Sequence, residues 1–117
     1  MGSNLVALSG EVTVKLPPQS RRGGRMQHLA LLLARALEGE PFQALCAGSD
    51  GRDGPTDHAG AIVDGETASL ARAKGIDLDQ AIARFDSEAA CRSLGIALPA
   101  FDSGTNLCDL VLVRVAR

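Results

Sequence analysis

Two polar, glycine-containing segments combine charged side chains with a backbone that a ligand can approach closely. The first runs from Arg21 to Arg25 and contains Arg22, Gly23 and Gly24. It directly precedes a helical pattern, so free N–H groups at the helix start and arginine guanidinium groups would suit a phosphate or a carboxylate. A solvated basic loop, in which the glycines serve only the turn, is the favoured alternative when composition alone is considered.

The second segment, residues 48–57, contains three aspartates, Asp50, Asp53 and Asp57. It follows an apolar strand pattern, and ligands of α/β proteins bind where strands end. Carboxylates at such a place can hold Mg²⁺, which makes Asp50 and Asp53 the candidate metal ligands. A turn-rich loop whose aspartates cap local N–H groups is an equal alternative.

The other polar or reactive side chains favour structural roles. Segment 103–106 contains Thr105 and Asn106, and taken alone it favours a turn over a ligand site. Neither His28 nor His58 neighbours a Ser or Cys in a triad-like motif, so both are expected to be structural or surface residues. The three cysteines include no CxxC pair, which predicts reduced core thiols in a cytoplasmic protein.

The elements that must position these segments alternate between strand and helix patterns. Residues 5–8 and 12–16 predict an opening β-hairpin around a turn at Ser9 and Gly10. A helix is predicted over 25–37, a buried strand over 42–47, a long loop from 48 to 60 and a short strand over 61–63. The alternation predicts a single α/β domain over residues 1–117, with residues 1–4 as a tag or a disordered end.

The second half of the chain predicts three short helices and then a strand. Thr67, Asp77 or Asp79, and Ser87 are the expected helix caps. A brief extended piece is expected at 96–99, and the aliphatic run 107–115 predicts a central strand. With the opening hairpin, this order predicts a mixed β-sheet with helices packed on it.

Composition excludes two classes of partner. The net charge is −2 and the chain has no Trp or Tyr, so a basic surface with base-stacking aromatics is not expected and nucleic-acid binding is disfavoured. The longest apolar run, residues 29–34, is far too short to span a bilayer, so no membrane association is expected.

Four segments resemble, in order, the motifs of one known family. Gly48–Asp64 is very similar to the central motif of the MOFRL domain, and Arg22–Gln27 resembles that domain's Gly-Arg-Gly-Gly-Arg-Asn-Gln. Leu8–Val14 resembles its Ser-Gly-Gly-Glu-Thr-Thr-Val, and Gly104–Leu110 resembles its Gly-Thr-Asn-Val-Asn-Asp. The chain is thereby identified as a MOFRL-type C-terminal domain of the glycerate kinases, a family that also carries hydroxypyruvate reductase names.

The resemblance implies an ATP-dependent kinase that converts D-glycerate to 2-phosphoglycerate in a cleft between two α/β domains. The missing N-terminal domain would act in cis or in trans. Arg25, with Arg22, would hold a carboxylate or phosphate. Asp50 and Asp53 would hold Mg²⁺ or orient the substrate hydroxyl, and Asp57 is a further candidate for the same roles. Further residues would line the substrate and nucleotide sites: Ser9, Gly10, Glu11, Gly23, Gly24, Gln27, Gly54, Thr105 and Asn106.

The chain also departs from the family's motifs. The opening motif has one glycine where the family usually has two, and Met26 and Cys108 stand where asparagines are common. These departures indicate a divergent substrate or a degenerate enzyme. The alternatives are a stand-alone structural or small-ligand-binding module and an NAD(P)H-dependent hydroxypyruvate reductase, the latter disfavoured because no dinucleotide motif is present. An aliphatic face without its partner domain would also favour self-association.

Overall fold

A computed structural model describes residues 3–10, 24–48, 51, 53, 58–101 and 109–116 of the chain. The sequence of elements alternates as predicted, with strands at both ends and helices between them. In chain order the elements are β1 (Ser3–Gly10), α1 (Arg25–Ala36), β2 (Phe42–Gly48), β3 (His58–Asp64), α2 (Thr67–Ala73), α3 (Leu78–Ala83), α4 (Ser87–Leu94), β4 (Ala97–Pro99) and β5 (Asp109–Ala116).

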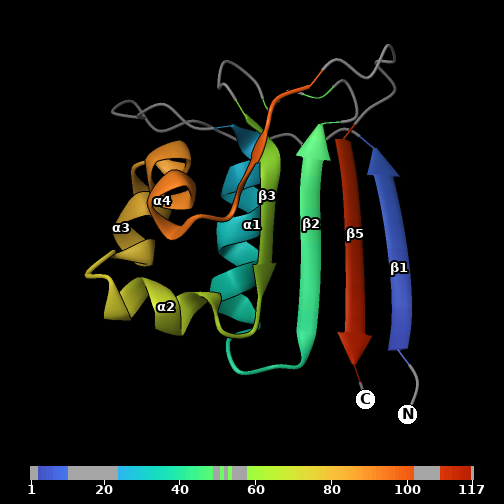
Figure 1. The fold of residues 1–117 in the computed structure, drawn as a ribbon, viewed down its shortest axis with the longest axis horizontal. Helices are drawn as coiled ribbons and strands as arrows, with labels where there is room; N and C mark the ends of the chain where they lie inside the picture. The colour runs from blue at the N-terminus through green and yellow to red at the C-terminus, as the bar shows by residue number, and fades with distance from the viewer. Residues whose placement is uncertain are drawn as a thin grey trace.

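The five strands form one sheet in the order β1-β5-β2-β3-β4 (Figure 1). The α/β class is confirmed, but every described pair of neighbouring strands is antiparallel, so the pairing itself is not mixed. The reason is that β5 lies between β1 and β2 and runs antiparallel to both. Strands β1 and β2 point the same way, and they would have been parallel neighbours if β5 did not separate them.

The opening segment differs from its prediction. Ser9 and Gly10 do not form a turn, because they continue β1 and pair with Leu110 and Asp109 of β5. Pairing with a distant strand has overridden the local turn signal. The second strand of the predicted hairpin, residues 12–16, lies outside the described residues.

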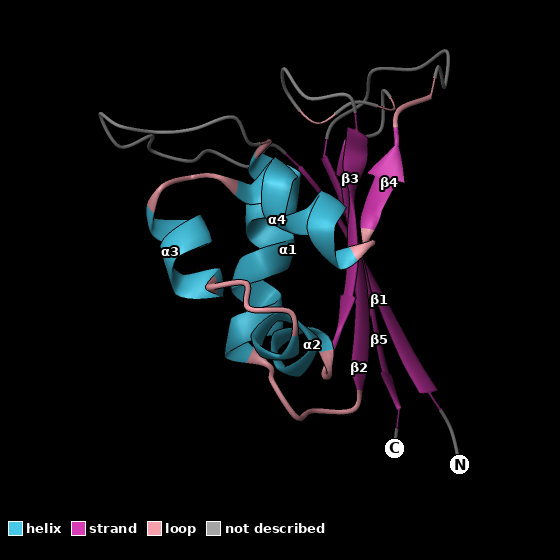
Figure 2. Cartoon of the chain, turned by 60° about the vertical axis from the view of Figure 1, so that its left-hand side comes forward, coloured by secondary structure: helices cyan, strands magenta, loops and turns pink. Residues whose placement is uncertain are grey.

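All four helices cover one face of the sheet (Figure 2). Helix α1 lies against β2 and β3, and its Met26 and Leu31 are fully buried together with Cys46 and Val63 of these strands. The alternation of β2 buries Phe42, Ala44 and Cys46 in this core. The core, which is mostly aliphatic, therefore lies between α1 and the middle of the sheet.

The opposite face of the sheet is bare of described helices (Figure 2). Leu45 of β2 pairs with Leu112 of β5 on one side and Ile62 of β3 on the other, so three large aliphatic side chains form one row across the sheet. All three are partly exposed and none belongs to the helix-side core.

Within the described residues, no helix is long and apolar enough to cross a membrane.

The helix ends follow the local signals in part. Asp77 caps α3 as predicted, since its carboxylate accepts a hydrogen bond from the N–H of Gln80 at 3.1 Å. Thr67 and Ser87 are not the caps of α2 and α4, because each is the first helical residue and the cap is the residue before it. Their hydroxyls bond elsewhere, to Asp64 and to the carbonyl of Gly24. Strand β3 begins at His58, three residues before the predicted Ala61.

Candidate functional site

One edge of the sheet gathers the ends of the segments that resemble the family's motifs. Gly10, the last residue of β1, pairs with Asp109 at the start of β5, and Asp109 also pairs with Gly48 at the end of β2. Beside them, Gly60 of β3 pairs with Ala47 of β2. The chain segments that follow Gly10 and Gly48 and that precede Asp109 therefore leave the sheet from the same edge.

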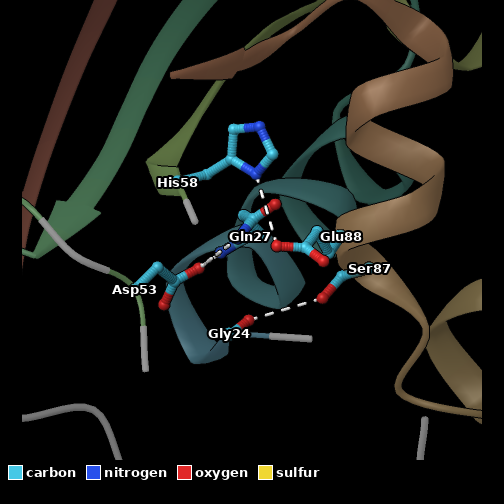
Figure 3. Close-up of polar contacts among 6 residues, drawn as sticks. All are labelled: Gly24, Gln27, Asp53, His58, Ser87 and Glu88. Atoms are coloured by element: carbon cyan, nitrogen blue, oxygen red, sulfur yellow. Dashed lines mark hydrogen bonds and ion pairs between the residues drawn. The ribbon is translucent and has the colours of Figure 1, made fainter. Parts of the chain in front are cut away.

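The start of α1 lies at this edge because Asp53 holds it there. One carboxylate oxygen, Oδ1, accepts from the N–H of Met26 at 2.9 Å. The other, Oδ2, accepts from the N–H of Gln27 at 2.7 Å and from its Nε2 at 3.0 Å (Figure 3). Asp53 is 1% exposed. The helix-start donors that were expected to face a ligand thus hold a carboxylate of the protein itself.

Gly24 leaves the room that this carboxylate occupies. It is the N-cap residue of α1, with extended backbone angles that any residue can adopt, and it has no side chain to cap the helix. A Cβ placed on Gly24 would lie 2.0 Å from Cγ of Asp53. Glycine is therefore required here for space, and Asp53 takes the place of a local cap.

The charge of Asp53 reflects opposing influences. Burial raises the pKa of its carboxyl, while the bonds from Met26 and Gln27 and the nearby Arg25 lower it in part. Arg25 is the first residue of α1 and is half-buried. The edge therefore places an arginine beside a carboxylate whose hydrogen-bond donors come from the same helix.

The chain around Asp53 is anchored at further points. The N–H of Gly51 donates to the carbonyl of Gly48 at 3.0 Å, and the N–H of Phe101 donates to the carbonyl of Gly51 at 3.1 Å. Gly51 has φ +86°, and a Cβ there would lie 1.7 Å from the carbonyl oxygen of Phe101. The N–H of Asp53 donates to the carbonyl of His58 at 2.8 Å. Gly51 is thus bonded to β2 and to Phe101, and Asp53 is bonded to β3.

Helix α4 adds two residues that were not predicted at this site, one of which, Ser87, was expected only as a helix cap (Figure 3). Ser87 Oγ donates to the carbonyl of Gly24 at 3.4 Å, and Glu88 Oε2 lies 3.3 Å from Nδ1 of His58. The side chain of Glu88 is 7% exposed and that of His58 is 19% exposed. No local signal marks these residues, because their partners are 63 and 30 residues away in the chain.

The remaining reactive side chains have the structural roles expected of them. His28 is buried and stacks on Phe85, with ring centroids 4.1 Å apart. Burial, and secondarily Arg35, lowers the pKa of His28. Cys46 and Cys91 are buried free thiols, and burial raises the pKa of each to about 12. Thiols of this kind are poor nucleophiles near neutral pH.

The predicted site residues divide by what the structure describes. Gly24, Arg25, Gln27 and Asp53 come together around the start of α1. Ser9 and Gly10 end β1, which β5 separates from β2. The others lie outside the described residues: Glu11, Arg22, Gly23, Asp50, Gly54, Asp57, Thr105 and Asn106.

A magnesium ion does not suit the described part of this edge. Three N–H donors already point at the two oxygens of Asp53, and an ion would need those same oxygens in a place that donors and Gly24 enclose. No three His, Cys, Asp or Glu side chains within the described ranges are grouped so that they could hold a metal. Asp50 and Asp57, beyond these ranges, stay the predicted ligands.

An open depression of about 640 Å³ lies at the opposite end of the sheet. It includes Glu38 and Glu40 before β2, Asp64 at the end of β3, and Arg114 of β5. It contains none of the residues predicted to bind substrate, nucleotide or metal. The depression is therefore separate from the described residues around Asp53.

Comparison with known proteins identifies the family. Residues 4–109 match the MOFRL family. The chain belongs to the MOFRL family. It is similar to a D-glycerate 2-kinase of Thermotoga maritima, with 50% identity over 91 residues, which are 77% of this chain and 22% of that protein. It is also similar, at 33% identity over 97% of its length, to an Agrobacterium vitis protein with a provisional hydroxypyruvate reductase name.

A solved structure has the same fold. The crystal structure of a glycerate kinase from Thermotoga maritima superposes with a TM-score of 0.89 and 42% identity, over 96% of this chain and 27% of that one. This MOFRL chain thus spans between about a fifth and a third of the length of the relatives named here, which are 22%, 27% and 30% covered.

Proposed function

We propose that this chain is the C-terminal domain of an ATP-dependent glycerate 2-kinase and forms one wall of its active site. The observation that carries the proposal is the convergence of the family's motifs on one edge of the sheet, beside the start of α1. The 50% identity to a D-glycerate 2-kinase supports the same activity. The substrate is then D-glycerate and the product 2-phosphoglycerate.

Arg25 is the residue we assign to the substrate's negative charge. It begins α1 at the edge of the sheet where Gly10, Gly48 and Asp109 lie. The next two N–H groups of the helix donate to Asp53. A carboxylate or phosphate would therefore be bound by the guanidinium itself. A guanidinium offers paired donors that match such groups. Arg22, in the same motif, is the proposed second cation.

Asp50 is the proposed catalytic carboxylate, with Asp57 beside it in the same motif. Gly51, the neighbour of Asp50, is itself held by hydrogen bonds to Gly48 and Phe101. These two aspartates would hold the Mg²⁺ that accompanies ATP and neutralises phosphate charge during transfer. Ser9, Gly10, Glu11, Thr105 and Asn106 belong to segments that adjoin the same edge and are proposed to line the cleft.

The rest of the active site would come from a second domain, in cis or in trans. The bare face of the sheet, with its row of Leu45, Leu112 and Ile62, supports the need for a covering partner. Without one, such a face favours self-association of the chain in solution. The hydroxypyruvate reductase alternative rests only on the name of one relative.

The test is a D-glycerate-dependent assay in the presence of ATP and Mg²⁺. It is run on this chain alone and on the longest reading frame that contains it. Formation of 2-phosphoglycerate is followed through enolase, which converts it to phosphoenolpyruvate without a mutase, so that 3-phosphoglycerate gives no signal. L-Glycerate and excess EDTA are the controls.

Activity in the longer chain alone would support a kinase half whose cleft needs both domains. A signal that requires added mutase would replace 2-kinase by 3-kinase specificity. Absence of ATP turnover in both folded proteins would overturn the proposal and favour the non-catalytic module.

A further inference from the structure

We infer that Asp53 is a positioning residue that clamps the start of α1 to β3 and so fixes Arg25 relative to the sheet. The effect on catalysis rests on the proposed function, whereas the clamp itself does not. In this role Asp53 accepts hydrogen bonds from N–H groups of the protein itself, whereas a metal or substrate ligand would contact the bound group directly.

The first argument is the use of both carboxylate oxygens. Oδ1 and Oδ2 receive bonds from three donors between 2.7 and 3.0 Å, all of them on Met26 and Gln27. Two of these donors are first-turn N–H groups, which no helical carbonyl can satisfy. With 1% of Asp53 exposed, the carboxylate faces the helix start and not the solvent.

The second argument is that the surrounding chain is built to receive this carboxylate. Gly24 lacks the Cβ that would collide with it at 2.0 Å, and Ser87 of α4 bonds the carbonyl of the same glycine. The cap of α1 therefore involves three separate segments of the chain. A local cap of the kind that Asp77 gives α3 needs only one.

The third argument concerns what the clamp connects. The N–H of Asp53 is bonded to the carbonyl of His58 at the start of β3, so the residue is tied both to the sheet and to α1. Arg25 is the residue directly before the two clamped N–H groups. Loss of the clamp would free the start of α1, with Arg25, to move relative to β3 while leaving the guanidinium in the molecule. Misplacement of this kind is costly for phosphoryl transfer, which depends on positioning.

Amide hydrogen exchange in the 117-residue chain tests the clamp directly. Asp53→Asn keeps the size of the side chain but removes its charge and presents an NH₂ to one of the three donors. We expect the amides of Met26 and Gln27 to exchange at least about tenfold faster relative to that of Leu31, a core residue of the same helix. Asp77→Asn, the same change in a local cap, should leave this ratio unchanged.

Gly24→Ala keeps Asp53 and fills its place, so it should reproduce the selective loss of protection. Unchanged protection of Met26 and Gln27 in both variants would overturn the clamp. Faster exchange of Leu31 by the same factor would do so as well, because it would report global destabilisation instead of a local release.

The positioning role is tested in the longer chain by D-glycerate turnover. Asp53→Asn should lower kcat/KM for D-glycerate by about tenfold or more, mainly through kcat, since Arg25 remains to bind the substrate. Asp77→Ala is the control for lost helix stability. Equal losses in the two variants at matched thermal stability would make Asp53 a structural cap only. An inactive wild-type chain would instead overturn the proposed function, and hydrogen exchange would then decide the clamp alone.

Discussion

The two ends of the sheet differ in what they offer a ligand. At one end, buried polar side chains of α1, α4 and Asp53 bond one another or nearby backbone groups. At the other end, a depression of about 640 Å³ opens beside Glu38, Glu40 and Asp64, and its ionisable groups are exposed. The described residues thus place a buried hydrogen-bonded cluster at one end of the sheet and an open charged depression at the other.

Under the proposed function, this chain contributes only one wall of a cleft between two domains, so the depression is a weaker guide to the substrate site than the groups around Asp53. At that end both oxygens of a buried carboxylate accept hydrogen bonds, and Gly24 and Gly51 stand where a side chain would collide with the protein.

The largest expected difference between the ends concerns activity. In the longer chain, Arg25→Ala should reduce D-glycerate turnover by a factor of about 10² to 10³, since it removes the proposed anchor of the substrate charge. Arg114→Ala, at the depression, should change turnover by less than about twofold. Steady-state kinetics of both variants measures the contrast. Near-wild-type turnover of Arg25→Ala, or a large loss in Arg114→Ala, would reverse the assignment of the two ends.

A smaller difference is expected in stability. Gly51 and Gly39 both have left-handed backbones, with φ of +86° and +84°, but only Gly51 is packed, against the carbonyl of Phe101. Gly51→Ala should lower the free energy of unfolding by about 2–5 kcal/mol, because strain and a steric clash add. Gly39→Ala should cost about 1 kcal/mol, from strain alone. Urea denaturation of both variants compares them, and equal costs would show that the packing at Gly51 is not tight.

The smallest difference concerns pH. Burial lowers the pKa of His28 below its unfolded value of 6.5, so the unfolded chain binds a proton first on acidification. The contribution of neutral His28 is complete above pH 6.5 and is lost as the pH falls, with a slope of at most about 1.4 kcal/mol per pH unit. His28→Gln should flatten this part of the curve between pH 5 and 7.

Glu38→Gln is the matched variant at the other end. Its bond from Arg72 lowers the pKa of Glu38 below 4.5, so this carboxyl titrates below the window in which His28 acts. The slope between pH 5 and 7 should therefore survive in Glu38→Gln. Denaturation curves recorded at several pH values between 5 and 7 give the slope of the free energy of unfolding against pH. An identical slope in His28→Gln and wild type would show that His28 does not cause it.

Local signals predicted the elements that depend on nearby residues. The helix over 25–37, the strand over 42–47 and the cap at Asp77 all rest on contacts within a few positions, and the structure has them. The resemblance of four motifs predicted the family correctly. Periodicity and turn chemistry suffice where the partner of a residue is close in sequence.

The errors arise where a distant partner decides. Ser9 and Gly10 continue a strand because β5, about a hundred residues later, pairs with them. Asp53 was recognised as important, but its partners are 26 and 27 residues away, so its role as a cap could not be read from spacing. The contact of Ser87 with Gly24, and Glu88 altogether, were missed for the same reason.

The position of β5 between β1 and β2 also has a consequence for how the chain folds. Among the described strands, β1 pairs with β5 alone, and Ser3 is matched with Ala116. During synthesis, β1 must wait for almost the whole domain to leave the ribosome, and one edge of β2 is unpaired for the same time. Late closure of such a long-range pairing slows folding and leaves open edges available for intermolecular pairing. Nascent chains of this family would therefore benefit from holdase protection until the final strand emerges.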